Sequence, residues 1–350
     1  MAPIPKGGTV AVTGSAGFIG GWLVRTLLDN GYRVRACVRD INDASKTDFL
    51  QKLPGFASHR LTLHAADLND DGCFDDVFRG CHGIAHVSHI NKYGDADYVK
   101  MVCDHMIASV DQSASVNRVV VTSSVAAVVS ESNFDEMVNR PVIYEDRFPD
   151  GDNPRLSGYS KSKQQAEDMF AEAAEASGKW DAITCCPADN VGPIQSAHQG
   201  NGGPWQGLVK KMLQGECNPT VHGYRPWHTV DVRDTAAYHM KLLENVNVQN
   251  GERYIAYSTD KIDIEEVCRR IDQLLPELSY ATPDLSEELD EEGLARSKRR
   301  REVYAGTDLR NDRIRSALDF TFRDLNDSIR DCVESLITVG AVEPVLRDGG

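Results

Sequence analysis

Short apolar runs alternate with longer segments of helical periodicity through the first half of the chain. The apolar runs predict strands at residues 9–13, 33–38, 61–65, 83–87, 118–122, 182–186 and, further along, 253–257. Helical patterns cover residues 17–30, which stop at Gly31, residues 97–117, and a segment that contains Tyr159. Such alternation is typical of βαβ units, so we expect an α/β protein with a doubly wound parallel sheet.

The pattern changes after the strand at 182–186. A loop rich in glycine, proline and asparagine runs through Pro204, and the chain beyond it mixes helices with short strands. We therefore expect residues 1–190 to form the sheet domain and 191–340 a smaller α/β substrate lobe. A later stretch, about 225–260, is expected to return to the sheet domain, and 341–350 to form a tail.

Composition narrows the class of protein. The chain has 350 residues, is 41% hydrophobic and 26% charged, and is long enough for a large domain with a second lobe. Its net charge of -15 disfavours nucleic acid and anionic membranes as partners. Nine cysteines without C-x-x-C spacing indicate reduced thiols in the cytoplasm and no metal site. We expect neither a signal peptide nor a membrane span, and a monomer or a homodimer.

Residues 284–301 run from acidic to basic. A solvated helix with compensating charges is the favoured interpretation, and a nuclear-localisation or phosphate-binding patch is the alternative.

A turn punctuated by glycines, Gly14-x-x-Gly17-x-x-Gly20, follows the first strand. The first glycine permits a tight turn, the second lets the backbone approach a pyrophosphate, and the third allows close helix packing. A glycine-rich strand-to-helix turn without a ligand is the alternative. The position between an apolar strand and an amphipathic helix favours a Rossmann-type dinucleotide site, with Phe18 and Ile19 among its contacts.

Arg39 follows the second strand, at the position where an acidic residue would bind the ribose diol of NAD. A guanidinium suits bidentate contact with a 2'-phosphate, so Arg39, with Lys46 as a second cation, favours NADP(H). Asp40 leaves room for some use of NAD(H). Asp67 and Leu68 are expected beside the adenine, although an aspartate at a strand end is often only a cap.

The other expected cofactor contacts follow the carboxyl ends of the strands, where open α/β sheets bind ligands. They are Val87, Ser88, Thr122, Pro187, Asn190 and Val191, together with Tyr159 and Lys163.

Ser124, Tyr159 and Lys163 are the candidate catalytic residues. Tyr159 and Lys163 are four residues apart, so a helix places them on one face. Ser124 follows a buried strand, where its hydroxyl can bond a carbonyl oxygen while the Tyr159 phenol donates a proton. The Lys163 ammonium is expected to stabilise the phenolate and to bind the nicotinamide ribose. A helical Tyr and Lys without chemistry is the alternative.

These motifs, with the loop Pro187-Ala188-Asp189-Asn190-Val191-Gly192-Pro193, make the chain similar to the extended short-chain dehydrogenases/reductases. It most resembles the branch of dihydroflavonol reductases, cinnamoyl-CoA reductases and fungal carbonyl reductases. Val38-Arg39-Asp40, the segment 230–234 and the segment 250–255 add to the resemblance. It implies hydride transfer between NADPH and a carbonyl, with Ser124, Tyr159 and Lys163 as the triad. His89 and Asp189-Asn190 depart from the branch, so its substrates do not carry over.

We therefore predict an NADPH-dependent aldehyde or ketone reductase, reversible as an alcohol dehydrogenase, for a bulky substrate that is aromatic or apolar. Aromatic residues of the second lobe favour an apolar pocket. The expected substrate contacts are His89, Asn190, Trp205 and Tyr224, with Trp205 as a lid residue and Trp227 as a core residue. Local backbone can satisfy His89 and Asn190 equally well.

Two other functions share the fold. One is an NAD-dependent sugar-nucleotide epimerase or dehydratase, which Arg39 disfavours. The other is a non-catalytic regulator that senses dinucleotides, which would not need Tyr159 and Lys163.

Overall fold

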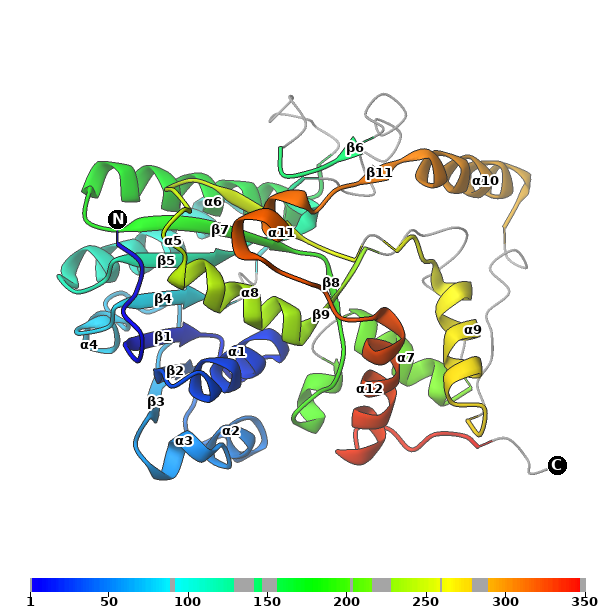
Figure 1. Ribbon diagram of the computed structural model, residues 1–350, viewed down its shortest axis with the longest axis horizontal. Helices are drawn as coiled ribbons and strands as arrows, with labels where there is room; N and C mark the ends of the chain where they lie inside the picture. The colour runs from blue at the N-terminus through cyan, green and yellow to red at the C-terminus, as the bar shows by residue number, and fades with distance from the viewer. Residues whose placement is uncertain are drawn as a thin grey trace.

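A seven-stranded parallel sheet forms the centre of the molecule (Figure 1). The computed structural model describes residues 2–88, 92–128, 142–146, 156–201, 204–215, 228–258, 260–278 and 289–346. The strand order is β10-β7-β5-β4-β1-β2-β3. The bounds are β1 Thr9–Thr13, β2 Arg33–Val38, β3 Leu61–Ala65, β4 Gly83–His86, β5 Arg118–Thr122, β7 Asp181–Pro187 and β10 Arg253–Ala256. The predicted parallel α/β fold is confirmed, and four of these strands have the predicted bounds.

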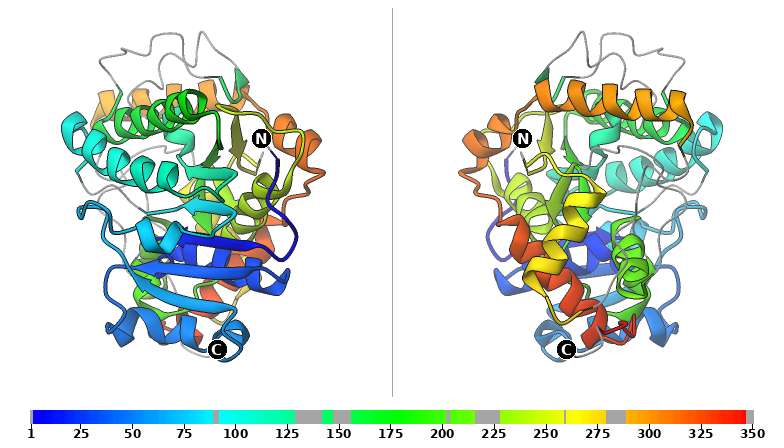
Figure 2. Two further views of the ribbon diagram at one scale, coloured as in Figure 1. Left: turned by 90° about the vertical axis from the view of Figure 1, so that its left-hand side faces the viewer. Right: turned by 90° about the vertical axis from the view of Figure 1, so that its right-hand side faces the viewer.

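Helices cover both faces of the sheet (Figure 2). On one face α1 (Phe18–Asp29) packs against α8 (Val232–Glu244), and on the other α5 (Ala96–Gln112) packs against α6 (Gly158–Ser177). The ends of α6 follow from its sequence, because the Ser157 side chain accepts a hydrogen bond from the Ser160 amide and Gly178 adopts a φ of 62°. Both α8 and β10 come after the glycine- and proline-rich loop in the sequence, yet α8 packs on α1 and β10 joins the sheet. Residues 232–256 therefore belong to the same helix and sheet layers as the first half of the chain.

A second lobe lies at the carboxyl edge of the sheet. There β7 continues into β8 (Asp189–Val191), which pairs in parallel with β9 (Thr229–Asp231). Around this pair gather α7 (Pro204–Leu213), α9 (Ile264–Leu274) and α12 (Leu325–Thr338), with α9 and α12 side by side (Figure 2, right). The lobe has its own apolar core, so it can hold a fixed shape beside the ligand edge of the sheet.

Smaller elements complete the described chain. They are α2 (Ala44–Gln51), α3 (Pro54–Ala57), α4 (Asp75–Phe78), β6 (Val142–Ile143), α10 (Glu291–Gly306), β11 (Asp308–Leu309) and α11 (Asp312–Leu318), with two 3₁₀ helices, η1 (Val125–Ala127) and η3 (Ala197–Asn201). The acidic-to-basic segment ends in α10, whose amino end is capped by Asp290 and whose arginines are mostly exposed. No helix in the described ranges is both long and apolar enough to cross a membrane.

Trp205 corrects the prediction of a lid residue. It lies inside α7, has no exposed surface and packs in the core of the second lobe. The physical reason is the apolar face of α7, on which Leu208, Val209 and Met212 are buried with it.

Ion pairs join α12 of the second lobe to the start of α8. Asp231 caps α8 and accepts hydrogen bonds from the Arg233 amide at 2.7 Å and from the Ser328 hydroxyl of α12 at 2.7 Å. The Arg233 guanidinium contacts Asp231 at 2.7 Å and reaches Asp331 of α12 at 2.5 Å. A charged junction therefore fixes α12 of the second lobe against the helix that packs on the sheet.

Asp234, in the first turn of α8, makes this junction sensitive to pH. Burial raises the pKa of its carboxyl to about 6, and the Asp231 carboxylate adds to the rise. The Arg323 amide, 2.7 Å away, and its half-exposed guanidinium, 3.3 Å away, oppose this without reversing it. Between pH 4 and 6 the folded protein therefore holds a proton that the unfolded chain has released, so this group's contribution to stability falls as pH rises.

We predict that Asp234→Asn removes this dependence. From pH 4 to pH 7 the free energy of unfolding of the variant should rise by about 2 to 3 kcal/mol relative to the wild type. Urea unfolding at several pH values measures it. Asp327→Asn, at an exposed position of α12, is the control and should run parallel to the wild type. A constant difference between Asp234→Asn and the wild type would contradict the prediction.

Candidate active site

The glycine-rich turn between β1 and α1 is fixed by close backbone contacts. Gly14 has a φ of 68°, and a Cβ there would lie 3.0 Å from the Ser88 backbone. A Cβ on Gly20 would lie 2.2 Å from the Gly14 carbonyl oxygen, which no side chain can tolerate. Gly17 precedes α1 and no side chain caps that helix. The first amide groups of α1 are therefore available to bind a phosphate.

A short 3₁₀ helix that follows β8, η3 (Ala197–Asn201), binds the backbone of this turn. His198 Nε2 lies 2.7 Å from the Ala16 carbonyl oxygen, and the Gln199 amide donates to the carbonyl oxygens of Ala16 and Gly17 at 3.3 and 3.2 Å. Sequence reasoning missed both residues, because about 180 positions separate them from the turn. The signal available was only their place in the loop after the sixth predicted strand.

Arg39 is exposed just beyond β2, and within the described ranges its side chain makes no hydrogen bond or ion pair. Lys46 instead pairs with Asp43 at 2.7 Å, and this hydrogen bond holds the pKa of the Asp43 carboxyl below its usual range. The Asp40 carboxylate accepts the Asn42 amide at 2.8 Å. Of these residues, Arg39 is thus the cation available to a ligand.

The predicted adenine contacts lie beyond β3. Asp67 accepts hydrogen bonds from the backbone and side-chain amides of Asn69 at 3.0 and 2.6 Å, which favours its role as a turn cap. Leu68 is nearly buried.

Lys163 connects α6 to the end of β5. It is 7% exposed, and its Nζ donates to the Thr122 carbonyl oxygen at 3.0 Å. The same Nζ lies 5.7 Å from the centroid of the half-buried Tyr159 ring. The structure therefore brings Tyr159 and Lys163 together at the end of β5, two residues before Ser124.

The charge of Lys163 acts on His86, which is buried at the end of β4. Burial first, and the Lys163 ammonium second, lower the pKa of His86 to about 3. The imidazole is therefore neutral at physiological pH. Its Nδ1 lies 3.0 Å from Thr13 Oγ1, and that oxygen accepts the amides of Val87 and Ser88 at 3.0 and 3.1 Å. Val87 and Ser88 are thereby held beside the glycine turn.

Ser124 is partly exposed beyond β5, where its Oγ accepts a hydrogen bond from the Ala126 amide at 3.2 Å. The hydroxyl hydrogen is not used in that bond and can be donated. Tyr93, which sequence reasoning missed, lies against Tyr159 edge to face with 4.8 Å between ring centroids. The Gly94 amide donates to Ser162 Oγ at 2.9 Å, so α6 itself holds the segment that carries Tyr93.

Other predicted contacts are less favourably placed. Asn190 donates to the Ala188 carbonyl oxygen at 3.0 Å and accepts from the Thr235 hydroxyl at 2.6 Å, which favours local structural bonding. Pro187 and Val191 are buried in β7 and β8. His89 and Tyr224, like Trp227, lie outside the described residues.

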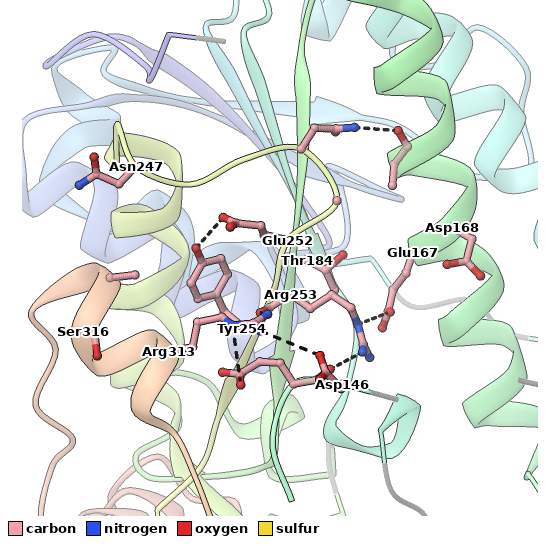
Figure 3. Close-up of a pocket in the computed structure, with 15 residues that line it drawn as sticks. Asp146, Glu167, Asp168, Thr184, Asn247, Glu252, Arg253, Tyr254, Arg313 and Ser316 are labelled. Atoms are coloured by element: carbon pink, nitrogen blue, oxygen red, sulfur yellow. Dashed lines mark hydrogen bonds and ion pairs between the residues drawn. The ribbon is translucent and has the colours of Figure 1, made fainter. Parts of the chain in front are cut away.

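A polar groove of about 970 Å³ lies at the β10 edge of the sheet (Figure 3). Five carboxylates and two arginines line it, and none of the predicted site residues does. It is therefore separate from the glycine turn. Among the described residues no group of three His, Cys, Asp or Glu side chains could hold a metal ion.

Comparison with known proteins identifies the family. The model of the NAD dependent epimerase/dehydratase family matches residues 10–256. The chain belongs to this family. A cinnamoyl-CoA reductase from Medicago truncatula is 33% identical over 291 residues, which cover 79% of this chain and 84% of that protein.

Two solved structures extend the comparison. Vestitone reductase from alfalfa (Medicago sativa) has a TM-score of 0.74 at 27% identity and covers 96% of this chain and 100% of its own. Yeast methylglyoxal/isovaleraldehyde reductase, complexed with NADPH, has a TM-score of 0.74 at 21% identity over 95% of this chain and 100% of its own, and shows the shared fold. The predicted resemblance is thus confirmed, and the protein is an NAD(P)-dependent reductase of the extended short-chain dehydrogenase/reductase family.

Proposed function

We propose that the protein is an NADPH-dependent reductase of aldehydes or ketones, reversible as an alcohol dehydrogenase. The observation that carries this proposal is the buried Lys163, bonded to the Thr122 carbonyl oxygen beside Tyr159. An ammonium holds three donors, and Thr122 takes one. The others are available to a phenolate and to a ribose hydroxyl.

Each of the proposed site residues has a separate role in carbonyl reduction. The glycine turn and Arg39 would hold the dinucleotide, and NADPH supplies the hydride when bound. The Ser124 hydroxyl donates a hydrogen bond to the carbonyl oxygen, and the Tyr159 phenol delivers the proton to that oxygen as the carbonyl carbon is reduced. The Lys163 ammonium stabilises the phenolate that remains until it is protonated again.

Arg39, which forms no ion pair with any residue that the structure describes, supports this function over a sugar-nucleotide epimerase or dehydratase that uses NAD. Tyr159 with Lys163 supports it over a regulator without chemistry. The substrate proposed is bulky and apolar. Tyr93, 38% exposed and packed against Tyr159, supplies an aromatic surface beside the reacting group.

Arg39→Ala is expected to weaken NADPH binding by about tenfold or more, because a charge-assisted contact with a phosphate contributes about 1.5 to 3 kcal/mol. Kinetics with NADH should barely change. Titration of both cofactors measures this, with Arg33→Ala, at the opposite end of β2, as the matched control. Equal losses with NADPH and NADH would show that Arg39 does not select the cofactor.

Tyr159→Phe should fold and bind NADPH while its kcat falls by about 100-fold or more, the contribution typical of general acid catalysis. Lys163→Ala should impair both cofactor binding and turnover, because it holds both roles. Tyr254→Phe, which removes a hydroxyl bonded to Glu252 at 2.8 Å on the edge strand β10, should retain its kcat. A Tyr159→Phe variant that keeps more than about a tenth of kcat would exclude that phenol as the acid.

A substrate series tests the proposed pocket. From acetaldehyde through hexanal and benzaldehyde to larger aryl ketones, kcat/KM with NADPH should rise, because apolar area removed from water contributes about 25 cal/mol per Å². Tyr93→Ala should reduce the aryl preference, whereas Tyr98→Ala on α5 should not. A flat series, or preference for acetaldehyde or for a sugar nucleotide, would overturn the apolar pocket.

A further inference from the structure

Glu167 is a buried carboxylate on the helix that carries the proposed catalytic residues. It follows Lys163 by four residues, as Lys163 follows Tyr159, so the three lie along one face of α6. Its exposed fraction is 3%. A carboxylate that is removed from water is retained only when it is paired and hydrogen-bonded, and its partners therefore indicate what it fixes.

Two of those partners lie on separate strands. Glu167 Oε1 accepts a short hydrogen bond from the Ser123 hydroxyl at the end of β5. Glu167 Oε2 pairs with Arg253 Nε of β10 at 2.7 Å (Figure 3). The Ser123 amide is held as well, by the Cys185 carbonyl oxygen of β7 at 2.7 Å. The carboxylate thus joins α6 to the carboxyl ends of the sheet.

At the end of β5, Thr122 and the next residue, Ser123, are each held by hydrogen bonds of their own. The Thr122 side chain bonds His239 of α8 at 2.8 Å, whereas its carbonyl oxygen accepts Lys163. Ser123 turns to the opposite face and bonds Glu167. Ser124 is extended, with φ -160° and ψ 153°, so its side chain reverses direction again. A change in the backbone conformation at Ser123 would therefore point the Ser124 hydroxyl in another direction.

We infer that Glu167 is a positioning residue, which, held by Arg253, fixes the direction of the Ser124 hydroxyl through Ser123. The inference rests on the proposed function, because it assigns Ser124 a bond to the substrate carbonyl. The groove at the β10 edge contains both members of the ion pair, and Arg253 also donates to the Glu145 carbonyl oxygen there. The proposed active site is therefore supported from the outer edge of the sheet.

Ser123→Ala tests the inference with the smallest disturbance, because it removes one hydroxyl and leaves the Glu167–Arg253 pair in place. We expect kcat/KM for the fastest aldehyde of the series to fall about tenfold, with the NADPH Kd within twofold of wild type and little change in Tm. Glu167→Gln should lower kcat/KM at least as much. Glu172→Gln, at an exposed position of the same helix, is the matched control and should change neither quantity.

A double-mutant cycle separates positioning from general stability. If Ser123 acts through Ser124, then Ser123→Ala should cost nothing further in a Ser124→Ala background. Additive losses, or an unaffected Ser123→Ala beside an impaired Ser124→Ala, would overturn the positioning role and leave the proposed function intact. Full activity of Ser124→Ala would instead overturn the proposed role of Ser124, and the positioning role with it.

Discussion

A buried ammonium requires an oxygen partner, and the arrangement of the site depends on how Lys163 obtains one. The Thr122 carbonyl oxygen is available because β5 ends there, so that this carbonyl faces α6. If α6 slid by one residue, the charge would lie without a partner in a region of low dielectric, at a cost of several kcal/mol. The bond therefore fixes the register of α6 against the sheet, and with it the position of Tyr159.

The same charge influences which of its neighbours can be ionised. Burial first, and the Lys163 ammonium second, lower the pKa of His86, so its neutral ring shares a hydrogen bond with the Thr13 hydroxyl and is not a second cation. Glu167, one turn further along α6, is paired with Arg253, and its carboxylate is directed to Ser123. The two buried charges of α6, Lys163 and Glu167, thus each have a defined partner on a neighbouring strand.

The fold could be predicted because its signals are local. Apolar runs bounded by turns gave the parallel strands, and the spacing of Tyr159 and Lys163 gave their common helix face. Trp205 was misplaced because three preceding residues, Gly202-Gly203-Pro204, suggested a loop, although proline also begins helices and the apolar spacing after it was helical. The contacts of His198 and Glu167 could not be predicted, because they join segments whose proximity only the folded chain determines.

Substitutions in the glycine turn and at Arg39 differ in their effect on folding. With 2.2 Å between a Cβ on Gly20 and the Gly14 carbonyl oxygen, any other residue there disrupts the backbone whether or not a dinucleotide binds. Arg39, exposed and without an ion pair in the described ranges, can be replaced with little effect on folding. A descendant of this protein that abandoned its chemistry would therefore keep the glycine motif long after Arg39 had drifted, and the arginine is the more informative marker of a working cofactor site.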